Sequence, residues 1–159
     1  MRAYYRYHQP ESPMPPTDTV PTSQRNLQTV QGIYQAFGAG DVGAIIPHIA
    51  PGARWEQWAA NTAQAANVPW LAPRTGPEGA AAFFAVVGGE FEIHEFAVLD
   101  MLSGERQVGV EVAIEATVRT TGKRFRDEEF HLWTFDDAGL VTRFRHYTDT
   151  ARHIDAATV

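Results

Sequence analysis

The sequence contains no cysteine, so it can form no disulfide and can offer neither a thiol nucleophile nor a cysteine ligand to a metal ion. A zinc site would have to use histidine and carboxylate side chains alone. The six histidines do not fall into a recognised ligand motif, and the pair His146 and His153 has no such spacing. We therefore expect no metal and no cofactor.

Long apolar runs and an excess of positive charge are also missing. No apolar run comes near the length of about 20 residues that spans a bilayer, and the first residues, MRAYYRYHQP, lack the apolar core of a signal peptide. The formal net charge is −6, whereas a surface for nucleic acid or anionic lipid needs a basic patch. We expect a cytoplasmic protein that binds neither nucleic acid nor membranes.

The length of 159 residues and the apolar fraction of 44% suffice for one domain with a real core. Residues 1–24 contain five prolines, which disfavour a helix or a central strand. We predict a Pro-rich arm over 1–24, one domain over 25–152 and a short tail over 153–159. The arm is either a disordered extension or a segment that lays its tyrosines on a neighbouring subunit.

Helical signals dominate the first half of the domain. Apolar residues recur at helical spacing from Leu27 to Phe37, after an expected N-cap at Ser23. Asp41 is placed to cap a short second helix, and Pro77 opens a third. The irregular stretch 59–77 is typical of a loop at the rim of a site.

Strand signals dominate the second half. Segments 90–102 and 107–119 precede a stretch, 124–149, whose two aromatic-rich runs flank a turn and predict a β-hairpin. Side chains alternate across a strand, which places His131 and His146 on inward faces of the two hairpin strands. The sequence therefore predicts that two histidines point into one enclosed space.

These elements predict an α+β domain with three N-terminal helices packed on a curved antiparallel sheet. Such a sheet, curling over helices, encloses a cone in which a pocket forms. In a short strand over 53–58, alternation places Gln57 inward and Glu56 outward. The side chains expected to contact a ligand in this pocket are Tyr34, Trp55, Gln57, Trp58, Trp133 and Phe144.

Three further polar residues receive structural expectations. His94 lies on a strand whose apolar phase changes midway, which a β-bulge would explain. Asp149 follows a strand and is expected to bond nearby backbone groups. His153 is expected at the surface or in a connection.

From about Asn26 to Ala151 the sequence resembles the nuclear transport factor 2-like (NTF2-like) superfamily, in its SnoaL-like, ketosteroid isomerase-related branch. The element order and two stretches, FEIHEFAVLDMLSGERQVGVEV and TGKRFRDEEFHLWTFDDAGLVTRFRHYTDTA, carry this resemblance. It implies a cone-shaped NTF2-like fold and a homodimer formed through the outer face of the sheet. The superfamily includes isomerases, polyketide cyclases, epoxide hydrolases, dehydratases and binding modules, so fold does not select the function.

Two enzyme classes of the superfamily can be compared residue by residue. The oxyanion-hole acid of ketosteroid isomerases falls on His131, and their catalytic base falls on Gln57, which cannot abstract a proton. The catalytic base of limonene epoxide hydrolases falls on His146, as does the acid/base aspartate of polyketide cyclases. The partner arginine and aspartate of the hydrolases fall near Val112 and Ile114, which are apolar.

We predict a cofactor-independent acid–base enzyme of the isomerase, cyclase or dehydratase type. It would act on a small apolar carbonyl or polyketide-like molecule. His146 would transfer the proton, and His131 would be an electrophilic or orienting donor. Three alternatives stay open: a non-catalytic protein that binds a small hydrophobic ligand, an epoxide hydrolase-like enzyme, and a subunit whose function is assembly through the arm.

Overall fold

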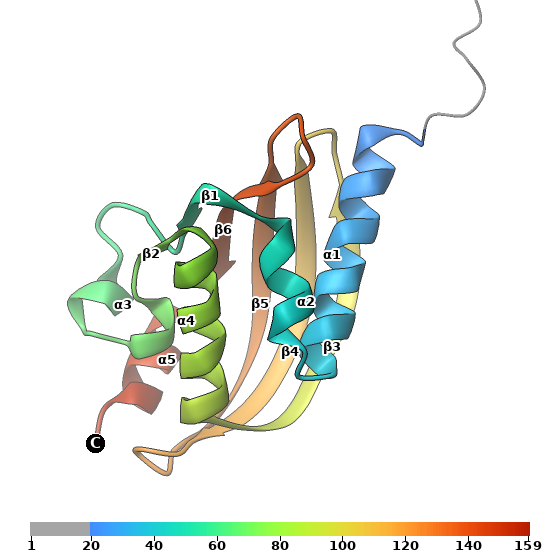
Figure 1. The fold of residues 1–159 in the computed structure, drawn as a ribbon. Coiled ribbons are helices and arrows are strands. Elements are labelled where there is room, and N and C mark those ends of the chain that lie inside the picture. Colours follow the sequence, from blue (N-terminus) through green and yellow to red (C-terminus); the bar gives the residue numbers. More distant parts are fainter. Residues whose placement is uncertain (1–19) are drawn as a thin grey trace, which may run out of the picture.

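The computed structural model describes residues 20–159, so most of the expected Pro-rich arm lies outside the described residues. In the described part, a six-stranded sheet is overlaid on one side by helices (Figure 1). This is the predicted α+β architecture. None of the described helices is long and apolar enough to cross a membrane.

The three predicted helices, α1, α2 and α4, begin close to their expected positions. They are α1 (Thr22–Gly38), α2 (Val42–Ile45), α3 (Thr62–Ala65), α4 (Gly76–Glu90) and α5 (Thr150–Ala157), with 3-10 turns η1 (Ile46–His48) and η2 (Pro69–Leu71). Asp41 caps α2 as predicted, because its carboxylate accepts a hydrogen bond from the backbone of Ala44. Ser23 is not the cap of α1: Pro21 occupies that position, without a side-chain hydrogen bond. The stretch expected to be irregular contains α3 and η2.

The sheet is mixed rather than purely antiparallel. Its strands are β1 (Ile49–Trp55), β2 (Arg74–Thr75), β3 (Phe91–Ser103), β4 (Gln107–Val118), β5 (Arg124–Phe135) and β6 (Val141–Tyr147). They lie in the order β2-β1-β6-β5-β4-β3, and only β1 and β6 pair in parallel. The expectation failed there because no hairpin joins β1 to β6, whereas short turns impose antiparallel pairing on β3 to β6.

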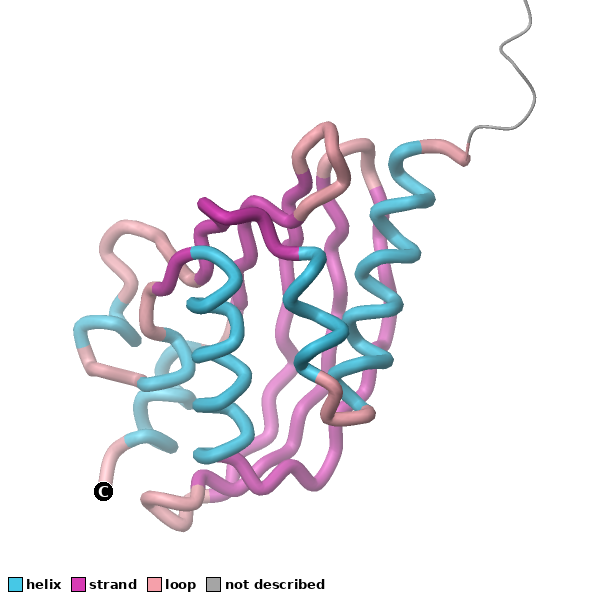
Figure 2. Tube along the Cα trace, viewed as in Figure 1, coloured by secondary structure: helices cyan, strands magenta, loops and turns pink. Residues whose placement is uncertain are grey.

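The register of the hairpin confirms the predicted inward faces. His131 pairs directly with His146, and Trp133 pairs with Phe144. All four side chains are buried. They pack against or line a cavity with residues of the helices α1 and α4, and Figure 2 shows α1, α2 and α4 lying together over one face of the sheet.

The edge strand β3 carries the expected bulge. Its register against β4 shifts between Ile93 and Glu95. This irregularity leaves His94 exposed, with Nε2 2.8 Å from Oγ1 of Thr117. His94 therefore lies outside the enclosed space.

Aromatic rings fill the centre of the domain. Trp55 is 0% exposed, and its ring centroid lies 4.4 Å from that of Phe144 and 5.3 Å from that of Phe83. The ring of Trp133 lies 4.3 Å from that of Phe144. This packing occupies most of the space that the curved sheet encloses.

Candidate functional site

A cavity of about 50 Å³ remains between the helices and the inner face of the sheet. This is room for about four water molecules, well below the several hundred Å³ usual for pockets that bind drug-sized ligands. Most of its wall is aromatic or aliphatic, and its carboxylate and imidazole side chains are those of Glu129, His131, His146 and His153. Only a small molecule fits the cavity as it stands.

Glu56 is the first unexpected element of this site. Its backbone is in the left-handed region, with φ of 54°, so strand alternation ends there. The side chain turns inward and is 0% exposed, against the prediction that it faces outward. One carboxylate oxygen, Oε1, accepts a hydrogen bond from the backbone N–H of His146 at 2.9 Å.

The same Glu56 oxygen lies 2.9 Å from Nδ1 of the His146 ring, although the angle is not that of a well-formed hydrogen bond. The other oxygen, Oε2, has no hydrogen-bond partner among the described residues. With Nδ1 facing the carboxylate, the remaining ring nitrogen of His146, Nε2, is left for the cavity that this residue lines. Glu56 and His146 therefore form a buried carboxylate–imidazole pair.

His131 is held at both ring nitrogens. Nε2 lies 2.9 Å from the carboxylate of Glu129, and Nδ1 lies 2.6 Å from the hydroxyl of Tyr34. Burial and the neighbouring His146 lower the pKa of His131 to about 4, so the ring is neutral near pH 7. The indole of Trp133 donates to the Tyr34 hydroxyl at 3.2 Å, and burial raises the pKa of Tyr34 above its usual range. The phenol therefore keeps its proton.

His153, expected at the surface, is 2% exposed. Its Nε2 lies 3.0 Å from Asp127 and 3.2 Å from Glu129, while the indole N–H of Trp70 donates to Nδ1 at 2.8 Å. Burial alone would lower the pKa of His153, but its bonds to the two carboxylates raise it to about 9. The Trp70 bond opposes that change, because an indole only donates and needs an unprotonated Nδ1. The two carboxylates favour an imidazolium, but that form would place two N–H groups against each other at Nδ1. We therefore assign the neutral ring, with its proton on Nε2, on the Trp70 contact.

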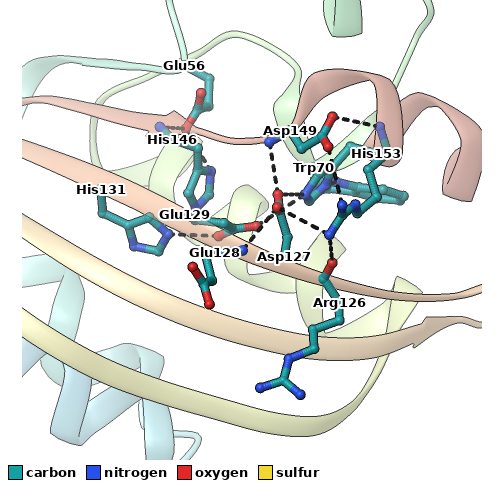
Figure 3. A network of polar contacts seen from close by, with 11 residues as sticks. Glu56, Trp70, Arg126, Asp127, Glu128, Glu129, His131, His146, Asp149 and His153 are labelled. Atoms are coloured by element: carbon teal, nitrogen blue, oxygen red, sulfur yellow. Dashed lines mark hydrogen bonds and ion pairs between the residues drawn. The ribbon is translucent and has the colours of Figure 1, made fainter.

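Glu129 joins the two parts of this network, as Figure 3 shows. One oxygen faces His131 and the other faces His153. Burial by itself would raise the pKa of Glu129, but the hydrogen bonds from these two rings outweigh it and hold the pKa below its usual range. The carboxylate is therefore ionised, and it accepts a hydrogen bond from an N–H group of His131 on one side and of His153 on the other.

Five of the predicted site residues meet at the cavity. Tyr34, Trp133, Phe144, His131 and His146 all line it. The ring centroids of the two histidines are 4.4 Å apart. These placements agree with the alternation of β5 and β6, whereas the roles assigned to the residues stay predictions.

The other three predicted ligand contacts lie elsewhere. Trp55 packs behind the cavity wall, in the core. The Gln57 side chain donates to the backbone carbonyl of Arg74 and to the hydroxyl of Thr75, each at 2.7 Å. The ring of Trp58 packs 5.0 Å from that of Tyr147. None of the three is a lining residue of the cavity.

Sequence reasoning missed Glu56, Asp127 and His153. The signal for Asp127 was present, because it alternates with Glu129 and His131 along β5. No local signal marks His153, whose burial depends on a contact with Trp70, 83 residues away. Asp149 has its expected structural role as N-cap of α5.

The arrangement offers two kinds of chemistry. The Glu56–His146 pair can exchange a proton with a molecule in the cavity, because one ring nitrogen faces that space. Metal binding is the other, since two groups of three buried residues each bring one donor atom per residue within 4.8 Å of one another. They are Glu129, His131 and His146, and Asp127, Glu129 and His153.

Comparison with known proteins identifies the fold. A family model described as a SnoaL-like domain matches residues 30–144, while no curated protein matches the chain. An NTF2-like protein from Burkholderia thailandensis E264 superposes with a TM-score of 0.71 at 24% identity, covering 84% of this chain and 98% of that one. A candidate SnoaL-like polyketide cyclase from Jannaschia sp. CCS1 gives a TM-score of 0.68 at 22% identity, covering 89% and 97%. TerC, crystallised with polyporic acid, gives 0.68 at 20% identity, covering 84% and 98%. The predicted NTF2-like fold is thus confirmed.

Proposed function

We propose, on the premise that the chain belongs to the SnoaL-like domain family, that it is an acid–base enzyme of the cyclase or isomerase type in which Glu56 and His146 transfer the proton. The observation that carries this proposal is the buried carboxylate 2.9 Å from Nδ1 of a histidine that lines the cavity. A buried charge is costly to fold. Ionisable groups in such surroundings, beside a cavity, are a recognised mark of functional sites.

In this proposal Glu56 sets the tautomer of His146. An ionised carboxylate favours the proton on Nδ1, so Nε2 keeps its lone pair for the cavity. Nε2 takes a proton from the substrate carbon next to a carbonyl group and returns it at the position where the product needs it. The ring regains its starting state, and no cofactor takes part in these two steps.

Tyr34 is the donor for the substrate oxygen in this proposal. Its hydroxyl lines the cavity, keeps its proton and rotates on its ring. By turning its O–H from His131 toward a substrate carbonyl, it would stabilise the negative charge that develops there. His131, with both ring nitrogens engaged, becomes the residue that orients Tyr34.

The dimensions of the cavity bear on the substrate class. A volume of about 50 Å³ admits a molecule of only a few non-hydrogen atoms. The mainly aromatic and aliphatic wall suits an apolar molecule. We therefore favour a small enolisable carbonyl compound over a multi-ring polyketide, which would require the domain to open.

The test is proton exchange at carbon. The purified chain is incubated in deuterium oxide with a panel of small ketones and β-dicarbonyl compounds, and loss of the α-proton signal is followed by NMR. We expect catalysed exchange that falls about 100-fold to 10,000-fold in His146→Gln, while ligand binding, measured separately by calorimetry, persists.

The matched control is His94→Gln, which alters an exposed histidine outside the cavity and should leave exchange unchanged. Unchanged exchange in His146→Gln would remove the assigned role. Binding without exchange by the unmodified chain would favour the alternative of a non-catalytic ligand-binding protein.

A further inference from the structure

Six ionisable side chains are buried side by side around the cavity, which is unusual for a domain of this size. They are Glu56, Asp127, Glu129, His131, His146 and His153. The two metal-compatible groups among them share Glu129. A histidine nitrogen binds a metal through its lone pair, so the hydrogen bonds of each ring decide which group is competent.

The group of Asp127, Glu129 and His153 fails this requirement. Trp70 donates its N–H to Nδ1 of His153, and an indole can only donate. Nδ1 is therefore the unprotonated nitrogen, and the proton sits on Nε2, the atom that faces both carboxylates. No lone pair of the His153 ring therefore points at the place where the ion would lie.

The group of Glu129, His131 and His146 meets the requirement. Nδ1 of His146 faces the Glu56 carboxylate, whose negative charge favours the proton on this nitrogen. Nδ1 of His131 faces the Tyr34 hydroxyl, which can accept as well as donate. Without a metal, Nε2 of His131 donates to Glu129, but its proton can move to Nδ1, since Tyr34 can accept it there. Both rings can then direct an Nε2 lone pair inward. Metal-binding histidines in proteins usually have such an oxygen partner on the second nitrogen.

The Glu56 carboxylate, behind the His146 ring, is a second and independent observation. It is 0% exposed, Oε2 has no hydrogen-bond partner among the described residues, and the contact of Oε1 with the His146 ring lacks hydrogen-bond geometry. A cation on Nε2 of His146 would make Nδ1–H a stronger donor toward this carboxylate. It would also offset the ionised Glu129.

We propose that Glu129, His131 and His146 bind one divalent first-row transition-metal ion, for which Zn²⁺ is the probe. Two imidazoles and a carboxylate suit Zn²⁺, and three protein ligands leave a fourth position open. The cavity, with room for a few waters, adjoins that position. Because tetrahedral ligands lie about 3.3 Å apart around a zinc ion, donors now within 4.8 Å of one another need only a small side-chain adjustment.

This inference goes beyond the proposed acid–base function and does not depend on it. The ion would use the lone pair of His146 that proton transfer also requires, so the metal-bound and catalytic states exclude each other. Zn²⁺ should therefore inhibit any α-proton exchange that the metal-free chain catalyses, and a chelator should restore it. Binding itself is measured without substrate.

The experiment uses the full chain after treatment with a chelator and removal of the chelator. Equilibrium dialysis against micromolar Zn²⁺, followed by elemental analysis, should give one ion per chain. Co²⁺ in place of Zn²⁺ should give the intense visible absorption of a four-coordinate site. His131→Gln and His146→Gln should lose both signals, while His153→Gln, which keeps a side-chain N–H, should retain them.

A further variant tests the carboxylate behind the site without removing a ligand. Glu56→Gln should weaken Zn²⁺ binding about 10- to 100-fold, the usual effect of losing such a partner. No stoichiometric binding, or binding that survives in His146→Gln, would overturn the proposal. If the chain bound a second Zn²⁺ ion that His153→Gln lost, the group of Asp127, Glu129 and His153 would bind metal after all. If a histidine variant does not fold, the Co²⁺ spectrum of the unmodified chain decides alone.

Discussion

Two buried tryptophans differ in whether their indole N–H has a partner. Trp70 is 2% exposed and donates to His153, whereas Trp55 is 0% exposed and its N–H has no partner among the described residues. Exchange for phenylalanine removes a similar volume at both positions. At position 70 it also removes the indole N–H that donates to the buried Nδ1 of His153. Leaving such an acceptor without a donor costs about 1–3 kcal/mol. Trp70→Phe should therefore lower the free energy of unfolding by that much more than Trp55→Phe.

Urea denaturation of the two variants and the unmodified chain measures this difference. Equal losses, or a larger loss at Trp55, would contradict the assignment of Trp70 as donor to Nδ1 of His153. The same result would weaken the argument that this ring cannot bind a metal.

Glu56 is the residue on which the proposed chemistry depends. Glu56→Gln retains an oxygen for the backbone N–H of His146 but loses the charge near Nδ1. We expect the ring to shift toward the tautomer with its proton on Nε2. Turnover should then fall about 100-fold or more with substrate affinity unchanged. Nitrogen-15 NMR of the histidine rings reports the tautomer directly.

The control for this change is Glu128→Gln, an exposed carboxylate on the opposite face of β5. It removes the same charge without touching the cavity. A normal His146 tautomer in Glu56→Gln would show that the carboxylate does not set the ring, whatever the activity.

At the scale of elements, helix α4 begins with a glycine that no other residue can replace without strain. Gly76 has φ of +68°, and a Cβ there would lie 2.5 Å from the backbone oxygen of Pro51. Gly76→Ala should lower the free energy of unfolding by about 2 kcal/mol or more, because the left-handed conformation and the backbone contact are both unfavourable.

Gly88, in the same helix, is the matched control. A Cβ there meets nothing within 4 Å, so Gly88→Ala should stabilise the domain by about 0.5–1 kcal/mol through helix propensity. Thermal unfolding of both variants measures the pair. The same sign of change in both would refute the account of the β2–α4 junction.

Regular elements explain which parts of the site the sequence could predict. Alternation along β5 and β6 placed His131 and His146 correctly, because both strands are continuous where the two residues pair. The same rule failed at Glu56, because β1 ends at Trp55 and the next residue adopts a left-handed backbone. Local patterns do not encode such a break, and they do not encode the long-range contact that buries His153 against Trp70.

At the scale of the whole molecule, the element order predicted the NTF2-like fold and the presence of a cavity. The size of the cavity was beyond the sequence, because it depends on how Trp55, Trp133 and Phe144 pack against one another. Composition reports that these rings are present and alternation reports which face they occupy. The cavity is the small difference between the volume that the sheet and helices enclose and the volume of the side chains inside it. Only the packing of these side chains determines its size.

The outer face of the sheet bears on the predicted homodimer, which stays a prediction. Phe130 and Tyr147, neighbours across β5 and β6, are 37% and 39% exposed. Leu102, which borders the same surface hollow, is 63% exposed. Apolar side chains gathered on one face favour association. In a two-fold interface each substitution is present twice, so Phe130→Glu would introduce two buried charges.

We expect the unmodified chain to have the mass of a dimer in light scattering coupled to size-exclusion chromatography, and Phe130→Glu to have the mass of a monomer with unchanged circular dichroism. The control is Val159→Glu, which adds the same charge at the exposed C-terminus beyond α5 (Figure 1). A monomeric unmodified chain would refute the dimer. If the Phe130→Glu variant stayed dimeric, the interface would lie on another face of the molecule. Two carboxylates buried without partners are too costly for a stable interface.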